Sequence, residues 1–395
     1  MTKTFKILVL GSGMQGRACS FDLLKNPALE QLILVDGDAK ALAATVKFLG
    51  SKKVRAVRAD VSDAAKVQKL AQGCDVVVSC VPYFLNLKLA KAAIAAKAHW
   101  VDLGGNTDIV LEELKLSEKA KKAGVTLLPD VGLGPGMTTT LAVHGMMQLD
   151  ETDEVLIRDG GLPQRPVPPM NYMLTFSEHG LINEYVEDAT ALRDFKVTKV
   201  GGLSEIETLD VPGLGRMEAA HASGGLSTLA YTYAGKIRSM DCKLIRYPGH
   251  CAVINAMNAM GFFSQKPLDV DGKKLAPRQL AAKLFRQHFS RPGDEDMVVI
   301  HTTIRGKKDG RRAEVVYDMI DRYDRQNKMT AMMRTTGFPA SIVAQMLATG
   351  EIDKPGAYPV ETGIPPQRFI DHMKARGFNL TWKLSYLESR QPVAA

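Results

Sequence analysis

Two hydrophobic periods alternate along the first 130 residues, and this alternation restricts the possible folds more than any other feature of the sequence. Short apolar runs rich in β-branched residues are typical of strands that are buried on both faces. They lie at residues 6–10, 32–35, 54–57, 76–80, 100–103 and 125–128. Between them, stretches with helical spacing lie at residues 15–24, 39–49, 64–71, 85–96 and 109–123. Because parallel strands need crossover connections, we expect a doubly wound parallel sheet.

The pattern changes after a glycine-rich segment at residues 132–136. Gly160, Gly161 and the prolines between residues 163 and 169 predict a long loop. Strands are expected beyond it at residues 196–200, 205–209, 239–245, 297–305, 313–321 and 328–334, and helices at 252–260 and 277–289. This order predicts a second, α+β domain with a mixed or antiparallel sheet.

Composition excludes several classes of protein. The chain has 395 residues, enough for two or three domains, and no apolar run approaches the roughly 18 residues that span a bilayer. The net charge of +8 is spread out, so no nucleic-acid partner is expected. Five cysteines without a CxxC pair predict neither a disulfide framework nor a metal site. We expect a cytoplasmic protein, since the apolar run at residues 7–10 is too short for a signal sequence.

The first predicted strand leads directly into the motif Gly11-Ser12-Gly13-Met14-Gln15-Gly16, which opens the first predicted helix. In this context a GxGxxG motif indicates a Rossmann dinucleotide-binding loop. Gly11 allows a tight turn, Gly13 lets the backbone approach a pyrophosphate, and Gly16 lets the helix pack closely on the strand. All six residues are predicted to bind the cofactor, whose phosphates face the N–H groups of the helix N-terminus. An ordinary glycine turn is the alternative.

Two aspartates follow the next two predicted strands. Asp36 lies twenty residues beyond Gly16, where a carboxylate accepts hydrogen bonds from both ribose hydroxyls and repels a 2′-phosphate. NAD is therefore expected rather than NADP, and Lys40 is the one nearby cation that weakens this preference. Asp60 is expected beside the adenine, with a helix-capping role as the alternative.

Further cofactor contacts are predicted after the fourth strand. Cys80, Val81 and Pro82 lie at the carboxyl edge of the sheet, where open α/β sheets bind ligands. Tyr83 is predicted to contact the substrate, or else to be an ordinary buried aromatic. Gly132 is expected to bring the backbone close to the nicotinamide.

Several motifs resemble those of the saccharopine dehydrogenase superfamily. In the first domain they lie at residues 11–16, 80–83 and 130–136. In the second they are GGLP at 160–163, PP at 168–169, LINEY at 181–185 and RYPGH at 246–250. The second set resembles the lysine 6-dehydrogenase branch of the superfamily. The resemblance extends from the first strand to about residue 263, and more loosely to the C-terminus.

The resemblance implies an architecture and an activity. The expected parts are a Rossmann domain at residues 1–131, a substrate-binding and dimerisation domain at 132–335, a returning segment at 336–367 that packs on the Rossmann domain, and a C-terminal segment at 368–395 on the second domain. The implied enzyme is an NAD-dependent homodimer, or a higher homo-oligomer. It would oxidise the ε-amino carbon of L-lysine to 2-aminoadipate 6-semialdehyde and release ammonia. Residues 294–335 are closer to the generic superfamily form, which leaves the exact substrate open.

Oxidation of an amine-bearing carbon needs a base and a clamp for the substrate's remote charge. Arg246 is the predicted carboxylate clamp, with a surface salt bridge as the alternative. His250 is predicted to carry a proton, or else to be structural. Asp102 and Asp130 are predicted to act as the base or to hold the ammonium, with loop capping as the competing role. Weaker substrate-binding candidates, with a solvent-facing role open for the glutamates, are Glu178, Glu184 and Tyr185.

Two other functions stay open. A saccharopine dehydrogenase or carboxynorspermidine synthase-type enzyme acts on a secondary amine whose second acidic arm needs another cation, and Arg158, Arg165 and Arg238 are available. An NAD-binding sensor or scaffold keeps the fold without turnover. The expected partner is a small amino-acid substrate, without nucleic acid or membrane.

Overall fold

The computed structural model describes residues 4–291 and 293–388, and the chain divides into two compact units. Unit 1 consists of Met1–Thr140, Ser227–Leu229 and Met333–Gly377, and unit 2 consists of Leu141–Leu226, Ala230–Met332 and Phe378–Ala395. Unit 2 therefore begins at Leu141 rather than at residue 132. The part of the expected C-terminal segment from residue 368 to Gly377 belongs to unit 1, and residues 389–395 lie outside the described residues.

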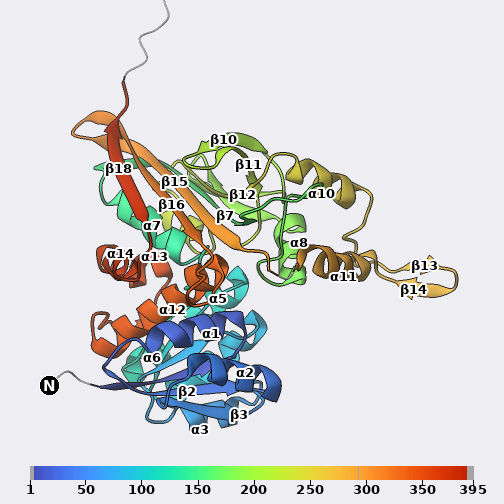
Figure 1. Ribbon diagram of the computed structural model, residues 1–395. Helices are drawn as coiled ribbons and strands as arrows, with labels where there is room; N and C mark the ends of the chain where they lie inside the picture. Colours follow the sequence, from blue (N-terminus) through green and yellow to red (C-terminus); the bar gives the residue numbers. More distant parts are fainter. Residues whose placement is uncertain (1–3, 292, 389–395) are drawn as a thin grey trace, which may run out of the picture. The chain divides into compact units, whose positions relative to one another are not determined.

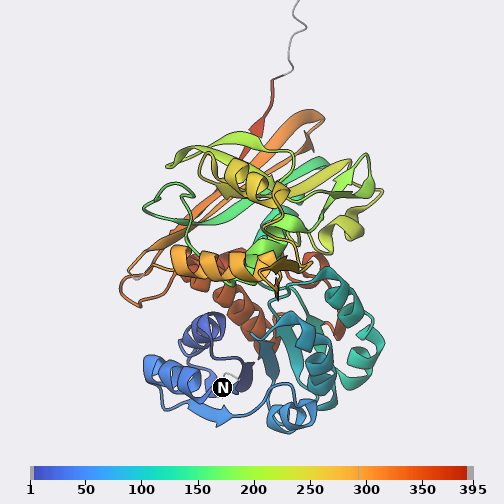
Figure 2. The same ribbon diagram turned by 90° about the vertical axis from the view of Figure 1, so that its right-hand side faces the viewer.

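Unit 1 contains a seven-stranded parallel sheet in the order β17-β6-β5-β4-β1-β2-β3, with helices on both of its faces (Figures 1 and 2). The strands are β1 (Phe5–Leu10), β2 (Leu29–Asp36), β3 (Val54–Arg58), β4 (Val76–Ser79), β5 (His99–Asp102), β6 (Thr126–Leu128) and β17 (Gly356–Ala357). The first six strands confirm the predicted doubly wound sheet. The seventh, β17, comes from the returning part of the chain and pairs with β6.

Aspartate side chains cap two of the helices of unit 1. The helices of this unit are α1 (Met14–Leu23), α2 (Ala39–Leu49), α3 (Ala64–Ala71), η1 (Tyr83–Leu85), α4 (Asn86–Ala95), α5 (Thr107–Leu114), α6 (Ser117–Ala123), α13 (Val360–Gly363) and α14 (Pro366–Ala375). Asp38 accepts hydrogen bonds from the first backbone N–H groups of α2, and Asp63 does the same for α3. The helix predicted over residues 109–123 is divided into α5 and α6.

Unit 2 is built on a nine-stranded mixed sheet with the path β10-β11-β12-β7-β15-β16-β18, to which β8 and β9 are attached. Its strands are β7 (Glu151–Pro163), β8 (Ala189–Arg193), β9 (Lys196–Val200), β10 (Glu207–Val211), β11 (Gly215–His221), β12 (Ser239–Arg246), β15 (Asp296–Lys308), β16 (Arg311–Arg322) and β18 (Leu380–Tyr386). Only β7 and β12 are paired in parallel among its described strands. The predicted mixed sheet is therefore confirmed.

Helices α8 (Glu178–Val186), α10 (His250–Ala259) and α11 (Pro277–Phe289) share one apolar core with residues of this sheet. Leu181 of α8, Cys251 of α10 and Phe285 of α11 lie in that core together with Ala220 and Leu244 of the sheet. A separate hairpin, β13 (Leu268–Val270) and β14 (Lys273–Leu275), precedes α11 (Figure 1). The remaining helices are α7 (Met137–Met146), α9 (Leu229–Tyr233) and α12 (Ala331–Thr349), each of which begins in one unit and ends in the other. None of the described helices is both long and apolar enough to cross a lipid bilayer.

Two predictions for this half of the chain are wrong. Gly160 and Gly161 do not belong to a loop but lie inside the central strand β7. Residues 328–334 do not form a strand. Residues 331–334 instead form the first turn of α12, because the carboxylate of Asp296 accepts hydrogen bonds from the backbone N–H groups of Ala331 and Met332, at 2.7 and 2.9 Å.

Candidate functional site

The glycine loop of unit 1 connects β1 to α1 and has the conformation that the motif requires. Gly11 has a φ of +95°, and a Cβ there would lie 2.6 Å from the carbonyl oxygen of Cys80. A Cβ on Gly16 would lie 1.9 Å from the carbonyl oxygen of Gly11. Around Gly13, in contrast, a Cβ would meet nothing within 4 Å, and no side chain caps α1. The first turn of α1 thus offers backbone N–H groups beside an open surface, which fits a dinucleotide pyrophosphate.

Asp36 lies at the end of β2 and is held by this loop. Its Oδ2 accepts hydrogen bonds from the backbone N–H and the hydroxyl of Ser12, both at 2.7 Å, and its Oδ1 accepts one from the N–H of Asp38 at 2.8 Å. Burial opposes ionisation of Asp36, but these hydrogen bonds outweigh it and lower the pKa of the carboxyl. An ionised carboxylate at the end of β2 fits the predicted ribose contact.

The other predicted cofactor residues take mixed positions. Cys80 follows β4 and packs beneath Gly11, and Gly132 lies in a tight turn in which its N–H donates to the carbonyl of Pro135. Tyr83 packs on Gly105, where a Cβ would lie 3.0 Å from its ring. Asp60 is exposed, and its side chain accepts a hydrogen bond from the N–H of Ser62 at 2.8 Å. The structure thus shows Asp60 in a local turn, and its adenine contact stays a prediction.

A chain of buried acidic side chains lies at the carboxyl ends of β5 and β6. The indole N–H of Trp100 lies 2.8 Å from Oδ2 of Asp102 and 3.0 Å from Oε1 of Glu113, and both carboxyl groups are fully buried. Burial, together with the charge of the adjacent Asp102, raises the pKa of Glu113 to about 11. Two carboxylates this close cannot both ionise in a dry interior, so Glu113 is protonated and hydrogen-bonds to Asp102.

Asp102 in turn fixes the backbone at Asp130. Its Oδ1 accepts hydrogen bonds from the N–H of Gly104 at 2.7 Å and from the N–H of Asp130 at 3.2 Å. Asp130 has a φ of +71°, a left-handed conformation that aspartate adopts only at a cost. A Cβ on Gly104 would lie 1.6 Å from Oδ1 of Asp130, so only glycine leaves room for this carboxyl group.

The pKa of Asp130 lies close to neutrality. Burial raises it to about 7, the charges of Asp102 and Glu361 add to the rise, and a hydrogen bond from the hydroxyl of Ser227 opposes it. Glu361 is itself buried and accepts a hydrogen bond from the hydroxyl of Thr228 at 3.0 Å. Because a general base works best with a pKa near the working pH, Asp130 has the properties that proton transfer requires.

Arg246 is the centre of a second polar cluster, in unit 2 at the end of β12. The side chain is only 2% exposed, so the alternative of a surface salt bridge does not apply. Its Nε donates to the hydroxyl of Tyr185 at 3.0 Å and one Nη donates to the carbonyl of Ile245 at 2.9 Å. The guanidinium also lies over the ring of Tyr172, 5.0 Å from its centre.

Both ring nitrogens of His250 have hydrogen-bond partners in this cluster. Its Nδ1 lies 2.9 Å from the carbonyl oxygen of Met170, and its Nε2 lies 2.9 Å from the hydroxyl of Tyr185. Burial, together with the charge of Arg246, lowers the pKa of His250 to about 3. The imidazole is therefore neutral and donates from Nδ1, which leaves Nε2 to accept from Tyr185. These contacts favour the structural alternative for His250, and its proton-carrier role stays a prediction.

Two carboxyl groups accompany Arg246, one on the buried side chain of Asp159 and one on the half-buried side chain of Glu184. Asp159 of β7 is 4% exposed, and burial raises its pKa to about 6 although the charges of Arg246 and Arg158 oppose the rise. Burial raises the pKa of Glu184 of α8 to about 8, again against the charge of Arg246. Glu178, which the sequence placed with the substrate contacts, instead forms an ion pair with Arg286 of α11 at 2.5 Å. It therefore links two helices, and its substrate contact stays a prediction.

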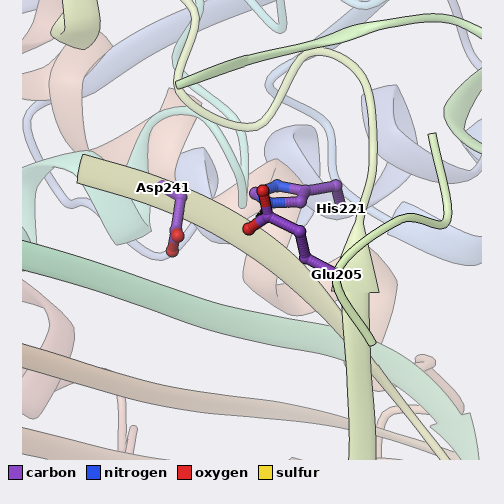
Figure 3. Close-up of side chains that lie close together, drawn as sticks. All are labelled: Glu205, His221 and Asp241. Atoms are coloured by element: carbon purple, nitrogen blue, oxygen red, sulfur yellow. Dashed lines mark hydrogen bonds and ion pairs between the residues drawn. The ribbon is translucent and has the colours of Figure 1, made fainter. Parts of the chain in front are cut away.

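A third group of side chains in unit 2 has the composition of a metal site. Glu205, His221 and Asp241 offer ligand atoms within 4.8 Å of one another, and Figure 3 shows the carboxylate of Glu205 against the imidazole of His221. The Nη2 of Arg193, however, lies 2.9 Å from Glu205, 3.0 Å from Asp241 and 3.4 Å from His221. The guanidinium thus takes the position of a cation, and the group is an ion-pair network.

Sequence reasoning missed several residues of these clusters. In unit 1 they are Glu113, Ser227 and Glu361, and in unit 2 they are Asp159 and Tyr172. Ser227 reaches Asp130 across 97 residues of sequence, so no local pattern could show it. The sequence did contain a signal for Asp159, because it follows a run of alternating polar and apolar residues that is typical of a strand. The two glycines after it, however, indicated a loop.

Two family models match the chain. The saccharopine dehydrogenase NADP binding domain matches residues 7–128, and the saccharopine dehydrogenase C-terminal domain matches residues 132–378. Carboxynorspermidine synthase of Vibrio cholerae is 25% identical over 364 residues, which are 87% of this chain and 85% of that protein. Saccharopine dehydrogenase [NADP(+), L-glutamate-forming] of Pyricularia oryzae is 28% identical over 212 residues, 50% of this chain and 44% of that one.

The structural comparison supports the same fold. The apo saccharopine dehydrogenase (L-Glu forming) of Saccharomyces cerevisiae superimposes with a TM-score of 0.80, at 20% identity, over 96% of this chain and 100% of that one. The chain spans less than half of the mitochondrial alpha-aminoadipic semialdehyde synthase of Bos taurus, 45% of its length, at 24% identity and 89% coverage of this chain. The dinucleotide loop, the two-unit architecture and both family models agree: the chain belongs to the saccharopine dehydrogenase family of pyridine-nucleotide-dependent oxidoreductases.

Proposed function

We propose that this chain oxidises the amine-bearing carbon of an amino acid, with the ε-carbon of L-lysine as the preferred position. The product would be 2-aminoadipate 6-semialdehyde, with release of ammonia. The observation that carries the proposal is Asp130, a buried carboxyl group whose pKa of about 7 suits a base for an ammonium proton. It follows β6, in a unit whose first turn offers a dinucleotide-binding loop.

The chemistry has to begin with a deprotonation. An ε-ammonium group has a pKa of about 10.4, and a carbon that bears it gives up hydride only after the nitrogen becomes neutral. Asp130 accepts that proton, and hydrogen bonds from the hydroxyl of Ser227 and the backbone N–H of Gly105 stabilise the carboxylate. A nicotinamide coenzyme, when bound at the glycine loop, would supply the acceptor for the hydride of this carbon. Water then replaces nitrogen, so the alkylammonium, water and the oxidised coenzyme give aldehyde, ammonium, one proton and the reduced coenzyme.

Arg246 supplies the remote anchor. The buried guanidinium donates from Nε to Tyr185 and from one Nη to the carbonyl of Ile245. Its other N–H groups are available to bind a substrate carboxylate. Its orientation is fixed by Tyr185, which His250 holds in turn. This arrangement supports the binding of a substrate carboxylate by unit 2.

For the coenzyme we propose NAD. The ionised Asp36 supports this choice because its charge repels a 2′-phosphate. The matching family model is described as NADP binding, and the named relative from Pyricularia oryzae uses NADP(+). Titration of the enzyme with each coenzyme decides between them, and tighter binding of NADP would refute the choice of NAD.

A secondary amine is the second candidate substrate, since the relatives include a carboxynorspermidine synthase and saccharopine dehydrogenases. Its extra acidic arm would need another cation. Arg158 is committed to Glu207 and Asp241, and Arg238 to Asp153, which leaves Arg165 as the exposed candidate of the three. These ion pairs favour the substrate with one carboxylate.

The deciding experiment measures coenzyme reduction or oxidation with three substrates: L-lysine, saccharopine, and an aldehyde combined with a diamine. We expect turnover with L-lysine, and none after Asp130→Asn. Turnover with saccharopine or with the aldehyde and diamine alone would establish the second candidate. Coenzyme binding without turnover of any of them would indicate a sensor or scaffold. The same preparation, analysed by light scattering, tests the homodimer that we also propose.

A further inference from the structure

We propose that Asp159 and Glu184 bind the α-ammonium group of the ligand whose carboxylate Arg246 binds, so that unit 2 selects a zwitterionic amino-acid head group. The inference rests on the proposed role of Arg246 and adds the specificity determinants to it. No role in binding was assigned to Asp159 by its sequence pattern.

The sheet register brings the acidic and basic groups to one face. Asp159 of β7 is paired with Leu244 of β12, and Arg246 follows two residues later on the same strand. Since side chains alternate between faces, Asp159 and Arg246 point to the same side. That side is the one on which Leu244 packs with α8 and α10, and α8 contributes Glu184 next to Tyr185, whose hydroxyl contacts Arg246.

Both carboxyl groups have an oxygen that lacks a partner. Oδ1 of Asp159 and Oε2 of Glu184 are buried and have no hydrogen-bond partner among the described residues. Another aspartate of the same sheet has partners for both of its oxygens. Asp241 of β12 forms ion pairs with Arg158 at 2.6 Å and with Arg193 at 3.0 Å. Leaving a buried acceptor unpaired is unfavourable, so a donor from outside the chain is expected at Asp159 and Glu184.

An ammonium group is the donor that matches this pair. It carries three N–H bonds and a positive charge, so it can satisfy two carboxyl oxygens at once. Burial keeps the pKa of Asp159 at about 6 and that of Glu184 at about 8, so near neutrality the cluster holds one guanidinium and roughly one carboxylate. A zwitterion is neutral overall and leaves the charge of the cluster unchanged. A carboxylate without an amine would pair with the guanidinium of Arg246 but leave Asp159 and Glu184 without a partner.

Calorimetric binding with two pairs of probes tests the proposal without any turnover. L-Lysine is compared with 6-aminohexanoate, which keeps the carboxylate and the terminal amine but lacks the α-amino group. L-Glutamate is compared with glutarate in the same way. We expect at least one of the two amino acids to bind about tenfold more tightly than its analogue, which corresponds to about 1.4 kcal/mol.

Asp159→Asn should reduce that ratio to about twofold or less while the analogue binds as before. The matched control is Asp153→Asn on the same strand, where the exposed carboxylate pairs with Arg238 outside the cluster, and there the ratio should persist. If Asp159→Asn does not fold, Glu184→Gln replaces it, because that side chain is only half-buried.

Three results would overturn the proposal: neither amino acid outbinds its analogue, none of the four probes binds, or the ratio survives in both variants. The carboxyl groups would then be satisfied by water. Loss of lysine turnover together with preserved discrimination by calorimetry would refute the proposed function and leave this inference standing.

Discussion

Asp36 and Asp130 are both aspartates that follow parallel strands, yet their surroundings shift their pKa values in opposite directions. Asp36 accepts hydrogen bonds from Ser12 and Asp38, which stabilise the charged form. Asp130 is enclosed beside other acids, and burial disfavours its charge. The sequence could place both residues at the carboxyl edge of the sheet, because strand ends follow from hydrophobic periodicity. It could not show which one would be a fixed anion, since that depends on groups far away in the chain, such as Ser227.

Asp36→Ala tests whether the ionised carboxylate of Asp36 binds the ribose of the coenzyme. Removing the carboxylate takes away the ribose contact and leaves Ser12 unpaired, so we expect NAD to bind about tenfold more weakly or worse, with NADP less affected. Fluorescence titration with both coenzymes measures this change. Asp60→Ala is the comparison, because its exposed carboxylate serves a local turn, and an equal loss of NAD affinity there would show that the adenine contact is real.

At the scale of elements, the local hydrophobic pattern predicts the secondary structure correctly where strands alternate with helices. It fails at strand β7, which contains glycines. Sequence positions 39–49, 64–71 and 277–289 are helices with those bounds. Gly160 and Gly161 indicated a loop, but they lie in a strand because its neighbours approach closely. A Cβ on Gly160 would lie 2.5 Å from the carbonyl oxygen of Ile245. Such a contact joins residues far apart in sequence, and periodicity carries no information about it.

Gly160→Ala should therefore destabilise unit 2. The added methyl group meets backbone atoms of β12, which cannot move without breaking the sheet, and we expect a loss of about 1–3 kcal/mol in the free energy of unfolding. Chemical denaturation followed by circular dichroism measures it. Gly201→Ala is the matched control, since a Cβ there meets nothing within 4 Å. Equal stability of the two variants would contradict the account of β7.

At the scale of the whole molecule, several carboxyl groups have pKa values of about 7 or higher. Asp130, Glu184 and Glu113 all have pKa values raised by burial, to about 7, 8 and 11. A carboxyl group whose pKa is higher in the folded chain holds a proton that unfolding releases at neutral pH. The free energy of unfolding therefore falls as the pH rises from the unfolded to the folded pKa. His250 acts in the opposite sense, but only below its ordinary pKa of 6.5.

Between about pH 7 and about pH 9 we expect the protein to lose stability, with Glu113 contributing up to about 1.4 kcal/mol per pH unit. Glu113→Gln keeps a neutral side chain beside Asp102 and removes the contribution of Glu113 to this slope. Glu112→Gln is the control, because that neighbour is exposed and pairs with Lys115. Denaturant titrations at several pH values give the slopes. If Glu113→Gln has the slope of the wild type, the buried glutamate is not protonated.

The scale of the whole chain is also where sequence reasoning reached its limit. Each unit is assembled from three separate stretches, and residues 227–229 supply Ser227 and Thr228 to the acidic cluster of unit 1. A resemblance to a family indicated that the chain returns, and α12 and β17 are formed by the returning part. The partners of Asp130 and Arg246, however, depend on these returns and on side-chain packing.

The pH dependence of kcat/KM for coenzyme reduction by L-lysine tests the central claim most directly. If Asp130 takes the substrate proton, kcat/KM rises with pH through an apparent pKa near 7. In Asp130→Asn this rise disappears, and kcat/KM falls at least about a hundredfold. A profile without that step, or a step that persists unchanged in Asp130→Asn, would contradict the account.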